Sequence, residues 1–199
     1  MAGRPRQFDR EEALDKAMRL FWERGYEGTS VGDLADALDI GKPSLYAAFG
    51  HKEQLFLETL DLYQSTRGSF AEGSLDAFPT ARAAIESVLR RNAEIYVDPS
   101  TPSGCFIVLA AVVGSPQNAE LRANLAQRRQ DSQNLFARRI AQGIADGDVA
   151  ATADPQAIAA FYITVINGLS LQARDGASRA ALDRIVGGAM AAWDPVSRS

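Results

Sequence analysis

Three short segments of this 199-residue chain hold side chains whose type and spacing suit chemistry or binding. The first, residues 28–32, reads Gly-Thr-Ser-Val-Gly and matches the G-x-S-x-G pattern of a nucleophilic serine. That chemistry requires a strand leading into the serine turn and a histidine placed to activate the hydroxyl. Here the pattern lies between two helical segments and His51 is the only histidine, so a serine-dependent hydrolase is kept only as an alternative.

The second segment is the single cysteine, Cys105, which follows the Pro/Gly-rich loop of residues 98–104. A thiol near a cation or a helix N-terminus can become a reactive thiolate, so a redox- or electrophile-sensing regulator is a further alternative. A cysteine followed by Phe-Ile-Val-Leu is more often a buried structural residue. One cysteine also excludes an internal disulfide.

The third segment, residues 42–52, suits contact with nucleic acid. Helical geometry gives it an inward face of Leu45, Ala48 and Phe49. The outward face consists of Pro43, Ser44 and Ala47. A surface this shallow fits a major groove about 12 Å wide, where a serine can hydrogen-bond to a base edge and apolar groups can meet a thymine methyl. Because no side chain here makes a bidentate contact of the Arg-guanine kind, phosphate contacts and DNA shape are expected to contribute much of the selectivity.

Two short amphipathic helices position these side chains. Apolar residues recur at helical spacing in the first, at Val31, Leu34, Ala35 and Leu38. Only residues 39–41 remain for a turn, so the two helices must cross sharply and pack through their apolar stripes. This is the sequence form of a helix-turn-helix, and it predicts double-stranded DNA as the partner. The residues expected to contact DNA are Arg4, Arg6, Thr29, Ser30, Lys42, Pro43, Ser44, Tyr46, Ala47, His51 and Lys52, with Tyr46 and Lys52 placed for phosphates.

The charge of the chain argues against a general polyanion binder. Its net charge is −4 and its pI is near 5.1. Residues 1–52 carry eight Lys and Arg against nine Asp and Glu, and the remainder carries 13 against 16. Because non-specific DNA affinity comes mainly from phosphate neutralisation, any basic surface must be local.

The rest of the sequence predicts helices and no strands. No segment shows sustained period-two alternation, although residues 105–113 are compatible with a buried helix or a buried strand. We expect an all-α fold of about nine helices. A three-helix N-terminal head, residues 1–52, would carry the helix-turn-helix, and residues 53–199 would form a C-terminal helical bundle.

The last two helices are the most hydrophobic of the long ones, and the helix around Phe161 is apolar on more than one face. Such a helix is buried on two sides, either in the core of a monomer or between two subunits packed as a four-helix bundle. The homodimer interface is expected to contain Ile158, Tyr162, Val165, Leu169, Leu182, Ile185, Val186, Ala189 and Trp193.

The segment from Phe8 to Phe56 resembles the DNA-binding domain of the TetR family of transcriptional regulators. The matching residues are Ala17, Phe21, Gly25, Thr29, Ser30, Leu34, Ala35, Lys42, Ser44, Leu45, Tyr46, Phe49, Lys52, Leu55 and Phe56. The resemblance implies an all-helical homodimer that represses transcription until a small molecule binds its C-terminal domain; an activator or nucleoid-type binder is the alternative. Gly41, Pro43 and Ala48 depart from the usual family residues, which leaves the operator sequence open.

The resemblance also places an effector pocket among the middle helices. The candidates for it are Phe70, Phe78, Leu89, Asn92, Tyr96, Cys105, Phe106, Leu109, Phe136, Phe161, Tyr162 and Asn167. Asn92 and Asn167 are the most informative, because an amide on an apolar face needs partners that a ligand can supply. The mixture predicts a mainly apolar effector of unknown identity. With no Cys/His cluster and no phosphate-binding loop, neither metal nor cofactor is expected, and the chain is not expected to be an enzyme.

The ends and the apolar runs of the chain predict a cytoplasmic protein without a membrane partner. The sequence Met-Ala-Gly-Arg-Pro-Arg at the start lacks the apolar core of a signal peptide. The longest apolar run, residues 105–113, is far shorter than the roughly 20 residues that span a bilayer.

Overall fold

The computed structural model describes residues 9–68, 75–110 and 118–197, and every regular element within these ranges is a helix. The expected all-α fold is therefore confirmed. The N-terminal elements are α1 (Arg10–Arg24), α2 (Val31–Leu38), α3 (Lys42–Phe49), α4 (Lys52–Tyr63) and the π-helical turn η1 (Gln64–Gly68). The later helices are α6 (Ala81–Ile95), α7 (Phe106–Ala110), α8 (Ala119–Asp146), α9 (Pro155–Arg174), α10 (Arg179–Ala191) and α11 (Trp193–Ser197).

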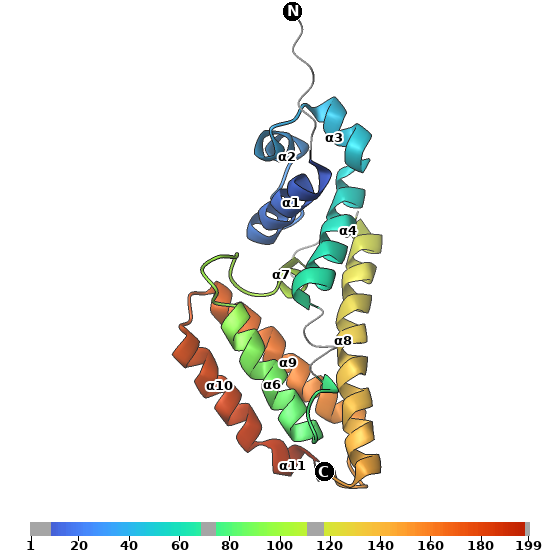
Figure 1. Ribbon diagram of the computed structural model, residues 1–199, viewed down its shortest axis with the longest axis vertical. Helices are drawn as coiled ribbons and strands as arrows, with labels where there is room; N and C mark the ends of the chain where they lie inside the picture. Colours follow the sequence, from blue (N-terminus) through green and yellow to red (C-terminus); the bar gives the residue numbers. More distant parts are fainter. Residues whose placement is uncertain (1–8, 69–74, 111–117, 198–199) are drawn as a thin grey trace, which may run out of the picture.

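The molecule is elongated, with α1, α2 and α3 at one end and the bundle of α6, α8, α9 and α10 at the other (Figure 1). Helix α4 runs from the head toward the bundle (Figure 1). The long helix α8 lies beside α4 and continues along the bundle (Figure 1). The ambiguous segment after Cys105 is helical from Phe106 to Ala110, and its last residues lie outside the described ranges.

Local signals explain the helix ends in the head. The Asp9 carboxylate accepts hydrogen bonds from the N–H groups of Glu11 and Glu12, which caps α1. Ser30 and Asp33 form a reciprocal capping box at the start of α2. Helix α2 ends at Asp39, whose φ of 53° is left-handed, and this conformation turns the chain sharply into α3.

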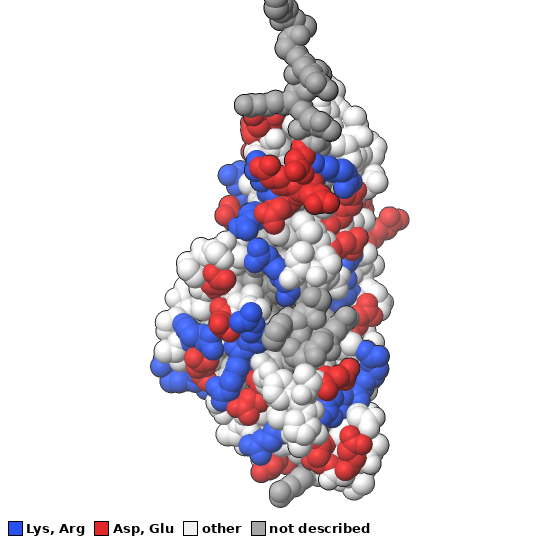
Figure 2. Space-filling view, in the orientation of Figure 1, with Lys and Arg blue, Asp and Glu red and all other residues white. Residues whose placement is uncertain are grey.

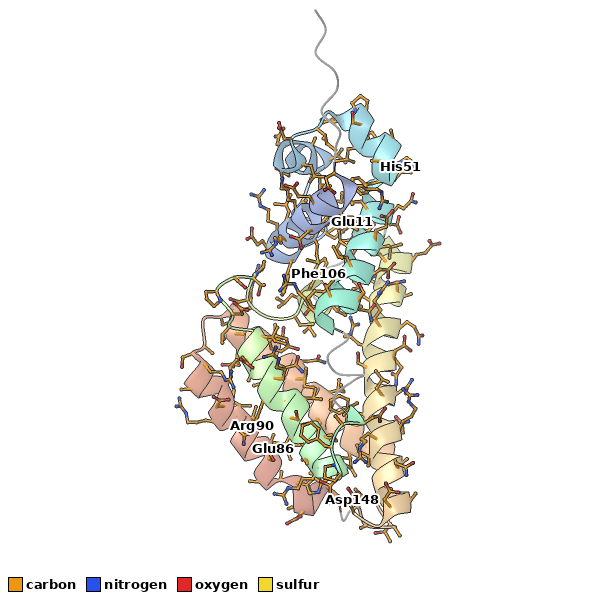
Figure 3. All side chains as sticks on the ribbon, viewed as in Figure 1. Glu11, His51, Glu86, Arg90, Phe106 and Asp148 are labelled. Atoms are coloured by element: carbon orange, nitrogen blue, oxygen red, sulfur yellow. The ribbon has the colours of Figure 1, made fainter. Side chains whose placement is uncertain are left out.

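Two apolar cores lie along the molecule. The upper core joins the buried faces of α1 to α4 and also includes Phe106 of α7 and Leu121 and Leu125 of α8. Phe106 contacts the rings of Trp22 and Tyr63 from below the head (Figure 3). Helix α4 packs against α1 of the head and against α7 of the remainder. The domain boundary expected after Lys52 therefore runs through this core.

The lower core fills the bundle of α6, α8, α9 and α10. Asp148, just after α8, fixes the start of α6 by accepting the N–H of Ala81 at 2.6 Å (Figure 3). Helix α9 is long and apolar enough to cross a membrane by length and composition. One side of α9 packs into this core, and a core helix can have the same apolar composition as a membrane-spanning helix.

The lower core also contains most of the residues expected between subunits. Seven of them are buried within the single chain: Ile158, Tyr162, Leu169, Leu182, Val186, Ala189 and Trp193. These side chains pack against their own chain, so they have little surface left for contact with a second copy. Of the expected set, only Val165 is partly exposed and Ile185 exposed.

Candidate functional site

Helix α3 presents a surface with a single charged side chain, Lys42, at the tip of the head. Leu45 and Phe49 are fully buried in the upper core. The exposed side chains are Lys42, Pro43, Ser44, Tyr46 and Ala47. In the space-filling view the surface over α3 is mostly uncharged, whereas carboxylates gather over α1 (Figure 2). The shallow outward face expected from helical geometry is therefore present and accessible.

Arg10 of α1 holds α3 and α4 in place. Its Nε donates to the Ala48 carbonyl at 3.4 Å, and its guanidinium lies 4.7 Å from the centre of the Phe49 ring. The same side chain pairs with the Glu58 carboxylate at 2.5 Å. One arginine thus fixes the orientation of the helix that presents the exposed face.

Lys52 and Thr29, both expected to contact DNA, face the interior of the head. The Lys52 Nζ donates to the carbonyls of Tyr26 at 2.7 Å and Thr29 at 2.8 Å, and lies 4.0 Å from the centre of the Tyr26 ring. Partial burial lowers its pKa. The Thr29 side chain is fully buried and donates to the Gly25 carbonyl at 2.8 Å. These residues position the loop before α2, a role that depends on long-range contacts not evident from sequence spacing.

The other expected DNA contacts lie at the surface or outside the described residues. Ser30 is exposed, but its hydroxyl caps α2 by accepting the Asp33 N–H. This cap stands where a hydrolase would need a strand-to-serine turn, so the hydrolase alternative is not favoured. His51 is exposed between α3 and α4, with its ring centre 6.1 Å from that of Tyr46 (Figure 3). Arg4 and Arg6 lie outside the described ranges.

A cavity of about 110 Å³ lies between the head and the bundle. Its walls come from the end of α4, η1, α6, α7, α8 and α9. The expected pocket residues that line it are Asn92, Tyr96, Cys105, Phe136 and Asn167. The cavity thus gathers residues that are far apart in the sequence around a single space.

The remaining pocket candidates lie elsewhere. Phe106 belongs to the upper core, and Tyr162 is buried in the lower core with its hydroxyl donating to the Ala189 carbonyl. Leu109 packs against the upper core and faces a groove beside the end of α1. Leu89 is buried in the lower core, whereas Phe78 and Phe161 are exposed. Phe70 lies outside the described residues.

Two buried phenols flank the cysteine in the cavity wall. The Tyr63 hydroxyl donates to the Cys105 Sγ at 3.4 Å. Burial raises the pKa of Tyr63 and Tyr96 well above the ordinary value, and the adjacent Cys105 contributes to both shifts. The backbone N–H of Cys105 donates to the Ser170 Oγ at 2.8 Å. These contacts give the thiol a structural role, so the sensing alternative gains no support.

The sequence analysis missed the charged residues of this cavity, Arg67 and Arg129. Arg67 follows α4 in the π-helical turn, which sequence periodicity does not reveal. Arg129 gives a clearer signal, because it occupies the same stripe of α8 as Leu125, Ser132 and Phe136. A charged residue on a stripe that is otherwise buried or lines the cavity is the sequence signal that could have pointed to Arg129.

Comparison with known proteins agrees with this geometry. Residues 13–59 match the family model "Bacterial regulatory proteins, tetR family", and residues 81–188 match "Tetracyclin repressor-like, C-terminal domain". The chain belongs to the TetR family. This TetR-family protein is therefore a helix-turn-helix transcriptional regulator, as its N-terminal pattern predicted.

Relatives of this TetR-family chain match along nearly its whole length. The HTH-type transcriptional repressor ComR of Escherichia coli K12 is 34% identical over 192 residues, covering 96% of this chain and 91% of ComR. The repressor BdcR of the same organism is 32% identical, covering 88% and 84%. A solved structure of the TetR regulator CifR, complexed with 26-base-pair operator DNA, is 45% identical with a TM-score of 0.92, covering 96% and 100%.

Proposed function

We propose that this protein is a homodimeric repressor that leaves its operator when a small effector fills the cavity. The proposal rests on the position of α4, which connects the two sites. This helix begins next to α3 and ends in the cavity wall at Tyr63. The relatives ComR and BdcR are named repressors, which supports repression rather than activation. The operator DNA bound to CifR supports double-stranded DNA as the partner. The proposed regulator acts on DNA in the cytoplasm, and the proposal assigns it no catalytic role.

The proposed coupling runs through α4. Lys52 at its start binds the carbonyls that precede α2, and Tyr63 at its end contacts Cys105 in the cavity wall. A ligand that displaces the end of α4 therefore also shifts the head. Two heads must sit about 34 to 36 Å apart to enter successive major grooves, so a small shift in each lowers affinity for the operator.

The proposed dimer surface is the exposed side of α9 and α10. It contains Phe161, Leu171 and Ile185, which are 37%, 44% and 39% exposed. Gly168 and Gly188 are also exposed on these helices, and a Cβ added at either meets nothing within 4 Å in the single chain. Small residues beside large apolar ones allow two helix pairs to approach closely about a two-fold axis. Phe161 and Leu171 thus replace the buried residues expected earlier.

Selecting bound sites from random DNA, followed by mobility shifts on the selected sequence, tests the DNA-binding part. Ser44→Glu places a carboxylate on the exposed face of α3 and should abolish the shift through repulsion of the phosphates. Gln130→Glu adds the same charge to the exposed side of α8 and should leave the shift unchanged. Binding retained by Ser44→Glu would contradict the assignment of α3 as the reading surface.

Substitution at the exposed side of α9 tests the dimer. Phe161→Arg should convert the protein to monomers in sedimentation, because an arginine there would have to be buried without a partner. Ala126→Arg, on the exposed side of α8, is the matched control and should leave the dimer intact. A dimer that survives Phe161→Arg would place the subunit interface elsewhere.

A further inference from the structure

Two neighbouring arginines of α8 have opposite surroundings. The Arg128 guanidinium pairs with the Asp61 carboxylate at 2.6 Å and donates to the Asn124 side chain at 2.7 Å and to Gln64. Arg129 lines the cavity, and its Nη1 is buried without a hydrogen-bond partner among the described residues. Arg128 is therefore bound by neighbouring side chains, whereas Arg129 lines the cavity with a buried donor that has no partner among the described residues.

A buried guanidinium donor without a partner is costly, so its presence calls for a counter-group. The described walls of the cavity contain a second guanidinium, from Arg67, and no carboxylate. Arg67 also influences Asp98 outside the cavity, so the argument rests on Arg129. Outside the described ranges the only side-chain carboxylate of the sequence is Glu72. Among the described residues, the cavity thus offers no negative group to pair with Arg129.

Much of the remaining cavity wall is apolar, and the space is small. Val88, Phe136, Ile163 and Ile166 contribute to them. Its volume of about 110 Å³ is somewhat below that of the roughly 150 Å³ engineered cavity that accommodates benzene. The Asn92 amide already donates to the Val88 carbonyl at 3.0 Å, which leaves its oxygen to accept from a ligand. The space therefore suits a compact apolar body.

We propose that the effector is a small carboxylate whose anionic group binds Arg129 and whose apolar body lies against Phe136, Ile163 and Ile166. A guanidinium presents parallel N–H donors that match the two oxygens of a carboxylate. A phosphate ester has the same sign of charge, but its bulkier head would leave less of this cavity for an apolar body. The inference rests on the proposed function in one respect, because both take this cavity as the effector site.

Calorimetry on the full-length protein without DNA tests the inference directly. The probes are isovalerate and benzoate, each paired with its neutral amide, isovaleramide and benzamide, and isobutyl phosphate as the bulkier anion. Losing a hydrogen bond to a charged group should weaken carboxylate binding about tenfold or more. Wild-type protein should thus prefer a carboxylate over its amide by about that factor, and Arg129→Gln should remove the preference.

Two variants serve as controls. Arg122→Gln removes an exposed arginine of the same helix and should retain the preference. Glu72→Gln removes the only carboxylate outside the described ranges and should retain or increase the preference. If Glu72 were the internal partner of Arg129, wild-type protein would bind no carboxylate and Glu72→Gln would begin to do so.

The inference is overturned if the amides bind as tightly as the carboxylates, if the preference survives Arg129→Gln, or if neither carboxylate binds. It is also overturned if isobutyl phosphate binds more tightly than both carboxylates. Mobility shifts separate this result from the proposed function. Carboxylate binding through Arg129 that leaves DNA binding unchanged would support the carboxylate site but contradict the proposed release of DNA through this cavity.

Discussion

The head and the cavity use positive charge in opposite ways. In the head, Arg10 and Lys52 direct their donors to carbonyls and a carboxylate of their own chain. In the cavity, Arg129 keeps a buried donor without a protein partner among the described residues. Arg10 and Lys52 therefore stabilise the fold that presents the exposed face of α3, whereas we propose that Arg129 is available to a ligand.

This comparison has a consequence for DNA recognition. The acidic chain provides little general attraction to DNA, and two cations of the described head, Arg10 and Lys52, are engaged by groups of their own chain. We therefore expect binding to depend on the fit of two heads to one operator more than on phosphate neutralisation. On the proposed function, a small change in the spacing of the heads would then release the protein.

The largest expected effect comes from the core that joins the two regions. Phe106→Ala should lower the free energy of unfolding by about 3 to 5 kcal/mol, because the buried ring contacts Trp22, Phe56 and Tyr63. Urea unfolding measures the loss. Tyr46→Ala, at an exposed position of α3, should change stability by less than about 0.5 kcal/mol while weakening DNA binding. Equal losses in the two variants would contradict the separation of core and reading surface.

A smaller effect tests the inward role of Lys52. Lys52→Met should destabilise the protein by about 1 to 3 kcal/mol, since two carbonyls lose a charged donor. Lys42→Met should leave stability nearly unchanged, because Lys42 is exposed on α3. The prediction for Lys42 concerns DNA: its loss should reduce the salt dependence of binding by about one unit of slope. Reversed outcomes would mean that Lys52, not Lys42, contacts phosphate.

Ser30→Ala should cost about 1 kcal/mol through loss of the α2 cap. Unfolding of the variant in urea checks the value. Ser178→Ala removes the same type of cap from α10, far from the head, and should cost a similar amount while leaving DNA affinity unchanged. A Ser30→Ala protein with full stability would show that Ser30 is reserved for DNA.

The smallest effect is a pH dependence of the same cap. Hydrogen bonds from the Ser30 side chain and backbone lower the pKa of Asp33 below its ordinary 3.8. The ionised carboxylate therefore stabilises the folded head above that pH, and this contribution disappears as pH falls through the lowered pKa. The stability difference between wild type and Asp33→Asn should shrink over that acid range. A difference that stays constant there would rule out the capping box as its source.

The head was largely predictable because its signals are local. The stripe of α2, the cap at Ser30 and the buried positions Leu45 and Phe49 follow from spacing within one or two turns. The inward direction of Lys52 was not predictable, because it depends on where α4 meets the loop before α2. Sequence spacing gives the face of a helix but not the element opposite it.

In the bundle, too, sequence spacing does not identify which element packs against each face of a helix. Helix α9 is apolar on two sides, and periodicity does not distinguish the side that meets α8 from the side left exposed. Tyr162 and Leu169 were therefore assigned to the subunit interface although they fill the core. The cavity was only partly predictable, since its walls are brought together from six elements and its arginines resemble ordinary surface charges in the sequence.

The continuity of the upper core sets a rule for building chimeric regulators from this chain. A head exchanged after residue 52 would separate Phe21 and Trp22 from Phe56 and Tyr63, which contact them from α4. Moving α4 with the head would still leave Phe106 facing foreign rings. A transplant with new DNA specificity should instead keep these aromatic residues and change only the exposed positions of α3.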